Sequence, residues 1–167
     1  FIDIGLLRDL NEFKKKYKEF VFKKSVFLDR DGVINHDYGY VYKIENFQWR
    51  KNVIKAIKFL NDNDYYVFVI TNQSGIGRGY YTEQDIKKLH DWINLTLKYY
   101  GAHIDKFYYA PYFHNSKMKF SFKDKMLRKP HSGMINKAKK EWDINFKKSF
   151  LIEDKVENLV IAKKYKM

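Results

Sequence analysis

The chain has 167 residues, of which 45% are hydrophobic and 32% are charged. At about 150 residues per domain, this length predicts one domain that can bury a core without covalent staples. The hydrophobic content excludes a disordered chain, and no apolar run is long enough to cross a membrane. The absence of cysteine excludes thiol catalysis and disulfides. No segment resembles a secretory leader, so we expect a cytoplasmic protein.

The charge balance is strongly basic, with 33 Lys and Arg residues against 20 Asp and Glu residues and a formal net charge of +13. Such a balance raises the question of nucleic-acid binding. Only five of the basic residues are Arg, the usual reader of base edges, and the lysines are scattered in pairs along the chain. We therefore expect a solvated surface that attracts small anionic substrates, with neither nucleic acid nor a membrane as partner.

Short apolar segments alternate with amphipathic segments along the chain. The predicted strands are residues 25–28, 65–70, 107–109 and 150–152, and the predicted helices are residues 51–62, a helix that starts at Thr82 and a helix opened by residues 128–130. This alternation is typical of an α/β fold with a doubly wound parallel sheet. Residues 111–130 lack clear periodicity, which predicts an inserted loop and no large cap domain. The glycines at 75, 77 and 79 are predicted to form a flexible turn, because their spacing does not match a nucleotide-binding loop.

Polar side chains follow three of the predicted strands and open the third helix. The first strand ends in Asp-Arg-Asp-Gly at residues 29–32, the second in Thr-Asn-Gln-Ser-Gly at 71–75, and the fourth in Glu-Asp-Lys at 153–155. Arg-Lys-Pro at residues 128–130 opens the helix. Because ligands of open α/β sheets bind outside the carboxyl ends of the strands, we expect these groups to form one site.

These segments resemble the haloacid dehalogenase (HAD) superfamily of phosphohydrolases. FLDRDGVIN, DYGYV, TNQSGIGRG and RKPHSGM are similar to the group that contains heptose-bisphosphate phosphatases and histidinol phosphatases, over about residues 24–165. The resemblance implies a HAD-like Rossmannoid fold. It also implies a Mg²⁺-dependent phosphatase that works through an aspartyl-phosphate.

The resemblance assigns roles to individual residues. Asp29 would be the nucleophile, and Asp31 would protonate the departing oxygen and then activate water. Thr71 and Lys129 would hold the phosphoryl oxygens. Mg²⁺ would be bound by Asp29, the backbone carbonyl of Asp31 and Asp154. The expected substrate contacts are Asp37, Tyr38, Gly39, Tyr40, Asn72, Gln73, Ser74, Arg128 and Lys155.

The chain departs from the pattern of its relatives at the last of these motifs. Relatives usually have Gly-Asp-Lys-x-x-Asp where this chain has Glu-Asp-Lys-Val-Glu-Asn at residues 153–158. The amide of Asn158 replaces a carboxylate, so we expect weaker Mg²⁺ binding and reduced activity. Relatives also continue into another strand beyond Met167, which would make this chain a fragment.

A second departure concerns zinc. The positions that match the zinc ligands of relatives hold Ala110, Tyr112, Lys125 and Leu127, none of which can make a tetrahedral thiolate and imidazole site. We therefore expect no zinc. The loop would instead be held by aromatic packing from Tyr109, Tyr112, Phe113, Phe120 and Phe122.

Residues 1–22 are predicted to be an N-terminal extension that precedes a phosphatase domain over residues 23–167. FIDIG and the helical stretch after it resemble the tail of sugar-phosphate nucleotidyltransferases, which implies a fused nucleotidyltransferase domain. A phosphatase that removes the 7-phosphate of D-glycero-D-manno-heptose 1,7-bisphosphate would supply such a partner in nucleotide-activated heptose biosynthesis. Histidinol phosphate is the alternative substrate. The alternative to an enzyme is a degenerate, non-catalytic domain, which Glu153 and Asn158 favour.

Overall fold

The computed structural model describes residues 10–11, 13, 16–17 and 21–167, so the predicted N-terminal extension and its resemblance to a nucleotidyltransferase tail lie almost entirely outside the described residues. One parallel sheet with the strand order β3-β2-β1-β4 forms the centre of the domain. Its strands are β1 (Ser25–Leu28), β2 (Tyr66–Asn72), β3 (Lys106–Ala110) and β4 (Phe150–Ile152). The predicted parallel α/β fold is confirmed.

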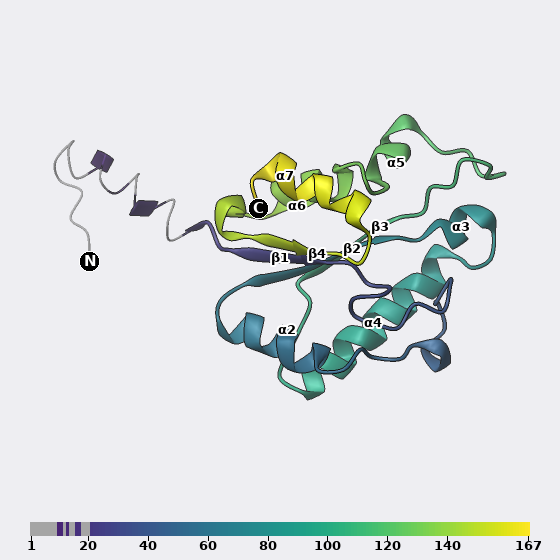
Figure 1. Ribbon diagram of the computed structural model, residues 1–167, viewed down its shortest axis with the longest axis horizontal. Coiled ribbons are helices and arrows are strands. Elements are labelled where there is room, and N and C mark those ends of the chain that lie inside the picture. The colour runs from purple at the N-terminus through teal and green to yellow at the C-terminus, as the bar shows by residue number, and fades with distance from the viewer. Residues whose placement is uncertain (1–9, 12, 14–15, 18–20) are drawn as a thin grey trace.

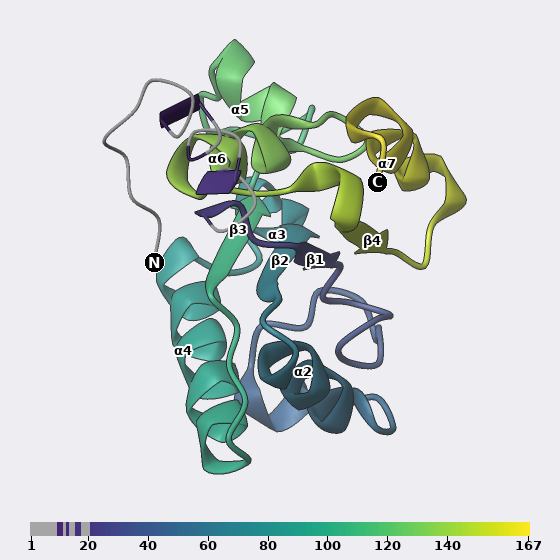
Figure 2. The same cartoon turned by 90° about the vertical axis from the view of Figure 1, so that its left-hand side faces the viewer.

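Helices cover both faces of the sheet. In Figures 1 and 2, α2 (Val53–Asp62) and α4 (Glu83–Tyr99) lie on one side, and α5 (Phe122–Leu127), α6 (Gly133–Glu141) and α7 (Val160–Tyr165) lie on the other. The short helix α3 (Ser74–Arg78) follows β2, and 3-10 turns occur at Ile44–Asn46, Phe146–Lys148 and Val156–Leu159. Among the described residues, no connection between strands forms a separate cap domain, and no helix is both long and apolar enough to cross a membrane.

The strand β1 is buried on both faces, which explains its uninterrupted apolar sequence. Side chains of a strand alternate between faces. Val26 and Leu28 accordingly pack into the core beneath α2 and α4, whereas Phe27 packs into the core on the side of α6. The sheet is thus the partition between two hydrophobic layers.

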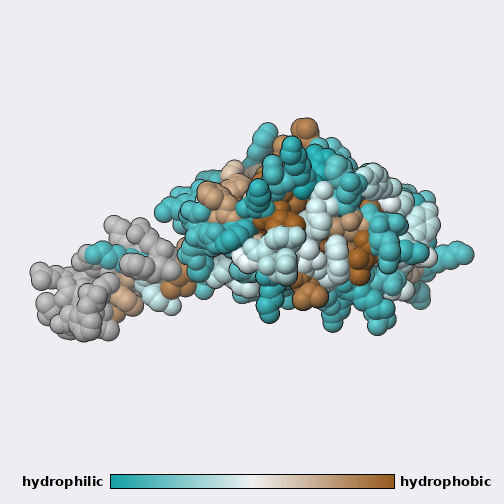
Figure 3. All heavy atoms as spheres, turned by 90° about the horizontal axis from the view of Figure 1, so that it is seen from below, coloured by the Kyte–Doolittle hydropathy of each residue, from teal (hydrophilic) through white to brown (hydrophobic). Residues whose placement is uncertain are grey.

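The helix α4 has the predicted amphipathic pattern. Thr82 and Asp85 form a complete capping box at its start, in which each side chain binds the other residue's backbone N–H. The buried stripe is Ile86, Leu89, Ile93 and Leu97. Lys87 and Lys88 are exposed on the opposite face. Figure 3 shows that the face formed by α2 and α4 is largely hydrophilic, with scattered apolar side chains.

Three local predictions are wrong. The glycines at 75, 77 and 79 do not form a flexible turn, because residues 74–78 form α3 and Gly79, at φ 77°, ends it in the left-handed conformation. The third helix begins at Gly133 rather than at residues 128–130, which form a turn in which the backbone N–H of His131 donates to the carbonyl of Arg128. The inserted loop contains α5, and Phe122 there is exposed instead of packed.

The strand order reverses between β1 and β4. The chain proceeds outward from β1 through β2 to β3, and β4 then returns to the other side of β1. Leu28 pairs with Ile152, so the residues that follow, Asp29 and Glu153, leave the sheet side by side. Such a switch point opens a crevice at the carboxyl ends of the strands, where ligands of α/β folds bind.

Candidate active site

A cavity of about 330 Å³ lies at the carboxyl edge of the sheet. The predicted site residues among those that line it are Asp29, Asp31, Asp37, Gly39, Tyr40, Thr71, Asn72, Ser74, Arg128, Lys129 and Lys155. They come from segments far apart in the sequence. The parallel sheet brings them together because each segment follows a strand or precedes a helix at the same edge.

The ammonium group of Lys129 lies between two carboxylates at the base of this cavity. Its Nζ is 3.0 Å from Oδ1 of Asp29 and 2.5 Å from Oε2 of Glu153. The side chains of Lys129 and Glu153 are almost completely buried, and that of Asp29 is 10% exposed. Charges this deeply buried are tolerated only when they are paired.

Lys129 is fixed through its backbone as well as its side chain. The amide of Asn72, at the end of β2, accepts from the Lys129 N–H at 2.9 Å and donates to the Lys129 carbonyl at 3.2 Å. Asn72 was expected to bind substrate. The structure shows that both polar atoms of its side chain already hold the Arg-Lys-Pro segment against β2.

A third carboxylate completes the acidic cluster. Ligand oxygens of Asp29, Glu153 and Asp154 all lie within 4.8 Å of one another. Asp154 reaches this position because Gly32 has no side chain: a Cβ there would be 2.4 Å from Oδ2 of Asp154, and the φ of Gly32 is +89°. The second carboxylate oxygen of Glu153, Oε1, is buried without a hydrogen-bond partner. Three convergent carboxylate oxygen donors match the preference of a hard divalent cation such as Mg²⁺.

The cluster shifts the titration of its members. Burial raises the pKa of Asp29 to about 7, with repulsion from Glu153 adding to the effect and attraction from Lys129 opposing it. Burial and the neighbouring Glu153 also raise the pKa of Asp154. Burial acts upward on Glu153 as well, but attraction to Lys129 together with hydrogen bonds to Asp29, Lys129 and Asn158 lowers the pKa of Glu153 below its ordinary value. One lysine therefore does not neutralise the cluster, which favours an additional cation.

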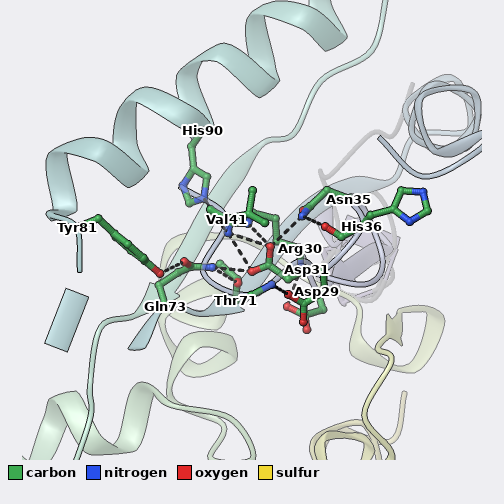
Figure 4. Close-up of polar contacts among 12 residues, drawn as sticks. Asp29, Arg30, Asp31, Asn35, His36, Val41, Thr71, Gln73, Tyr81 and His90 are labelled. Carbon is green, nitrogen blue, oxygen red and sulfur yellow. Dashed lines mark hydrogen bonds and ion pairs between the residues drawn. The ribbon is translucent and has the colours of Figure 1, made fainter. Parts of the chain in front are cut away.

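The carboxylate of Asp31 is surrounded by hydrogen-bond donors. Arg30, whose side chain is fully buried, donates to both oxygens of Asp31 from Nη2 at 2.9 Å. Asn35 donates to Oδ1 and Gln73 to Oδ2, each at 3.0 Å. Arg30 is itself held by the carbonyl of Val41 at 2.5 Å. Figure 4 shows Asp31 at the centre of these contacts.

His90 of α4 lies next to the Arg30 guanidinium, beside its Nη1 atom. Its Nε2 is 3.5 Å from Nη1 of Arg30, and its ring stacks on Phe107 at 4.2 Å. Burial lowers the pKa of His90 well below its ordinary value, and the positive charge of Arg30 lowers it further. The imidazole is therefore neutral and supports Arg30 from within the core.

Two of the predicted substrate contacts do not line the cavity. Tyr38 is exposed and its hydroxyl donates to Gln48, outside the cavity. Gln73 is 1% exposed, and its amide is used in hydrogen bonds to Asp31, Thr71 and Tyr81. His131, which follows the Arg-Lys-Pro segment, is exposed and also lies outside the lining.

The structure brings to the site further residues to which the sequence had assigned no role in holding substrate or its charged groups. Tyr81 and Asn158 line the cavity, and Glu153, Arg30 and Asn35 hold its charged groups. A fully buried arginine has no sequence signal, because arginine is ordinarily exposed. Glu153 supplies a carboxylate beside Asp29.

Solved structures resemble this fold closely. A HAD-like phosphatase from Mesorhizobium loti superposes with a TM-score of 0.80 and 28% identity, over 87% of this chain and 70% of that chain. The D,D-heptose 1,7-bisphosphate phosphatase from B. bronchiseptica, solved in complex with magnesium and phosphate, superposes with a TM-score of 0.74 and 26% identity over 85% of this chain and 76% of that chain.

Related sequences lead to the same family as the related structures. A family model described as polynucleotide kinase 3 phosphatase matches residues 25–166. A D-glycero-beta-D-manno-heptose-1,7-bisphosphate 7-phosphatase from Haemophilus ducreyi is 42% identical over 141 residues, which are 84% of this chain and 77% of the relative. The chain belongs to the HAD-like phosphatases. A D-glycero-alpha-D-manno-heptose-1,7-bisphosphate 7-phosphatase from Campylobacter jejuni is 40% identical over 136 residues, 81% of this chain and 74% of the relative.

For this HAD-like phosphatase, the raised pKa of Asp29 predicts a pH-dependent stability when no metal is bound. The pKa of Asp29 is about 7 in the folded chain against an ordinary value of 3.8, so folding favours the protonated carboxyl. The stability that this group contributes is therefore complete below about pH 4 and is lost as the pH rises through about 7. Asp29→Asn removes this group, so we expect it to change the free energy of unfolding more favourably at pH 8 than at pH 4. The expected difference between the two pH values is about 4 kcal/mol.

This difference is measured by denaturant unfolding in EDTA at both pH values. The control is Asp62→Asn, which removes an exposed carboxylate that pairs with Lys58 on α2. The control is expected to show the same small effect at both pH values. An Asp29→Asn variant whose stability differs from the parent by the same amount at pH 4 and pH 8 would contradict the prediction.

Proposed function

We propose that this HAD-like phosphatase is a Mg²⁺-dependent phosphomonoester hydrolase that works through an aspartyl-phosphate on Asp29. The observation that carries the proposal is the position of the Asp29 carboxylate. It lies at the base of the cavity, 3.0 Å from the Lys129 ammonium and within one cluster with Glu153 and Asp154. This position supports a nucleophilic role for Asp29, with Lys129 and a bound cation as the charge-stabilising groups.

In the proposed first step, an oxygen of Asp29 attacks the phosphorus atom and the bond between phosphorus and the ester oxygen breaks. Asp31 gives its proton to the departing oxygen, which leaves as the alcohol. In the second step Asp31 takes a proton from water, and the resulting hydroxide attacks the same phosphorus. The acyl-phosphate bond then breaks, which frees inorganic phosphate and restores the Asp29 carboxylate.

Other residues of the cavity support these steps. We propose that Lys129 and Thr71 hold the phosphoryl oxygens, which is supported by their place in the lining of the same cavity as Asp29. We propose Asp29, Asp154 and the backbone carbonyl of Asp31 as the Mg²⁺ ligands. The bound cation would offset the repulsion between the Asp29 carboxylate and the phosphate dianion.

We propose D-glycero-D-manno-heptose 1,7-bisphosphate, cleaved at its 7-phosphate, as the substrate. Relatives that are 42% and 40% identical carry the corresponding names. The rim of the cavity also suits a second anionic group, because Arg128 and Lys155 line it and Nη1 of Arg128 is buried without a hydrogen-bond partner. Fusion to a nucleotidyltransferase remains a proposal from the sequence of residues 1–22.

The substrate proposal is tested by phosphate release from both anomers of the heptose bisphosphate and from histidinol phosphate, each with and without Mg²⁺. We expect Mg²⁺-dependent release from the heptose ester and a kcat/KM at least about 10²-fold lower for histidinol phosphate. Faster release from histidinol phosphate would support the alternative substrate. Release from neither ester would indicate a non-catalytic domain.

The nucleophile is tested by Asp29→Asn. We expect this variant to release no phosphate, because the amide nitrogen and oxygen cannot attack phosphorus as a carboxylate does. The variant should melt cooperatively like the parent, and Asp62→Asn should retain full activity. Turnover by Asp29→Asn within about tenfold of the parent would refute the assignment.

We also propose that the loop of residues 111–130 is held without zinc. The loop contains α5, whose start is capped reciprocally by Ser121 and Asp124, and the rings of Tyr112 and Phe120 meet edge-on at 5.7 Å. We expect the melting temperature to be unchanged by a zinc-selective chelator at fixed Mg²⁺. Elemental analysis that finds roughly one zinc per chain after dialysis would overturn this proposal.

A further inference from the structure

The amide of Gln73 joins the two sides of the reaction centre. Its Nε2 donates to Oδ2 of Asp31 at 3.0 Å and to Oγ1 of Thr71 at 2.8 Å. The same side chain is 1% exposed, so no solvent competes for these bonds. Gln73 therefore connects the group that serves the leaving oxygen with a group that holds the phosphoryl oxygens.

Tyr81 determines which way this amide faces. The Tyr81 hydroxyl donates to Oε1 of Gln73 at 2.8 Å, as Figure 4 shows. A rotated amide would present its carbonyl oxygen to the Asp31 carboxylate and its NH₂ group to the Tyr81 hydroxyl. It would lose both donations to the reaction centre and, whenever Asp31 is ionised, would add a repulsion between two acceptors. The hydrogen-bond network accordingly fixes Nε2 toward Asp31 and Thr71.

Tyr81 is in turn held by close packing. Its ring stacks on Tyr42 at 4.7 Å between centroids. It also lies directly on the backbone of Gly75, where a Cβ would be only 2.2 Å from the Tyr81 ring. The side chain is 6% exposed, and burial raises the pKa of Tyr81 to about 12, which keeps the hydroxyl proton in place for Gln73. The chain of contacts is rigid from Gly75 to Asp31.

We propose that Gln73, oriented by Tyr81, is a positioning residue that holds the Asp31 carboxyl group in register with the Thr71 hydroxyl. The inference rests on the proposed function, in which Asp31 protonates the leaving oxygen. Arg30 and Asn35 also bind Asp31, but both belong to the segment that follows β1. Gln73 follows β2, so it is the contact that ties Asp31 to the neighbouring strand.

The test compares two phosphate esters that differ in their need for a proton donor. The ester oxygen of heptose 1,7-bisphosphate must be protonated as it leaves, because a sugar alkoxide is a poor leaving group. The nitrophenolate of 4-nitrophenyl phosphate leaves readily as an anion. Gln73→Met removes both donors at nearly constant volume, and Tyr81→Phe removes only the hydroxyl. Tyr108→Phe is the matched control, because Tyr108 is equally buried and hydrogen-bonded but lies outside the cavity.

We expect Gln73→Met to lower kcat/KM for the heptose ester by about 10²-fold and Tyr81→Phe by about tenfold. For 4-nitrophenyl phosphate, both variants should remain within about threefold of the parent, since kcat/KM reports the step up to loss of the leaving group. Tyr108→Phe should leave both esters unchanged. This selective loss is not expected from a merely structural residue, which would affect the two esters alike.

The outcomes separate the inference from the function on which it rests. A parent chain that releases no phosphate from either ester overturns the proposed function. An active parent whose variants lose both esters equally, or neither, overturns the inference alone. If Gln73→Met does not melt cooperatively, Tyr81→Phe carries the test, because it keeps the ring that packs on Gly75.

Discussion

The ion pair network of Lys129 with Asp29 and Glu153 is the interaction on which the site depends. Two carboxylates and an ammonium group are buried together, and each would be costly to bury alone. The arrangement leaves the cluster with more negative than positive charge once Asp154 is included. Such an excess would favour a divalent cation. Burial, together with repulsion from Glu153, raises the pKa of Asp29 to about 7.

The sheet provides the geometry that this network requires. Because β4 pairs with β1 and not with β3, Glu153 and Asp29 leave adjacent strands at the switch point. The backbone of Lys129 is fastened to the next strand by Asn72. Three strand ends thus hold one charge network, and the two hydrophobic layers on either side of the sheet keep those ends in place.

A second hydrogen-bond network fixes the position of the Asp31 carboxylate next to the ion pair network of Lys129. Its donors come from a fully buried arginine, an asparagine and a glutamine, and the glutamine is oriented by Tyr81. Buried polar networks are stable only when their members are satisfied, so each contact restrains the others. Preorganisation of this kind limits the reorganisation that remains when substrate binds.

The sequence by itself determined the strands, the order of the motifs and most of the cavity lining, because parallel strands place the residues that follow them at a shared edge. It identified Asp29, Asp31, Thr71 and Lys129 from the resemblance, and the structure brings all four to one cavity. Only the tertiary structure decided that Glu153 shares Lys129 with Asp29 and that the buried Gln73 donates to Asp31 and Thr71. These contacts depend on strand register, on side-chain rotamers and on close approaches at glycine, which link residues far apart in the chain and leave no periodic signal in the sequence.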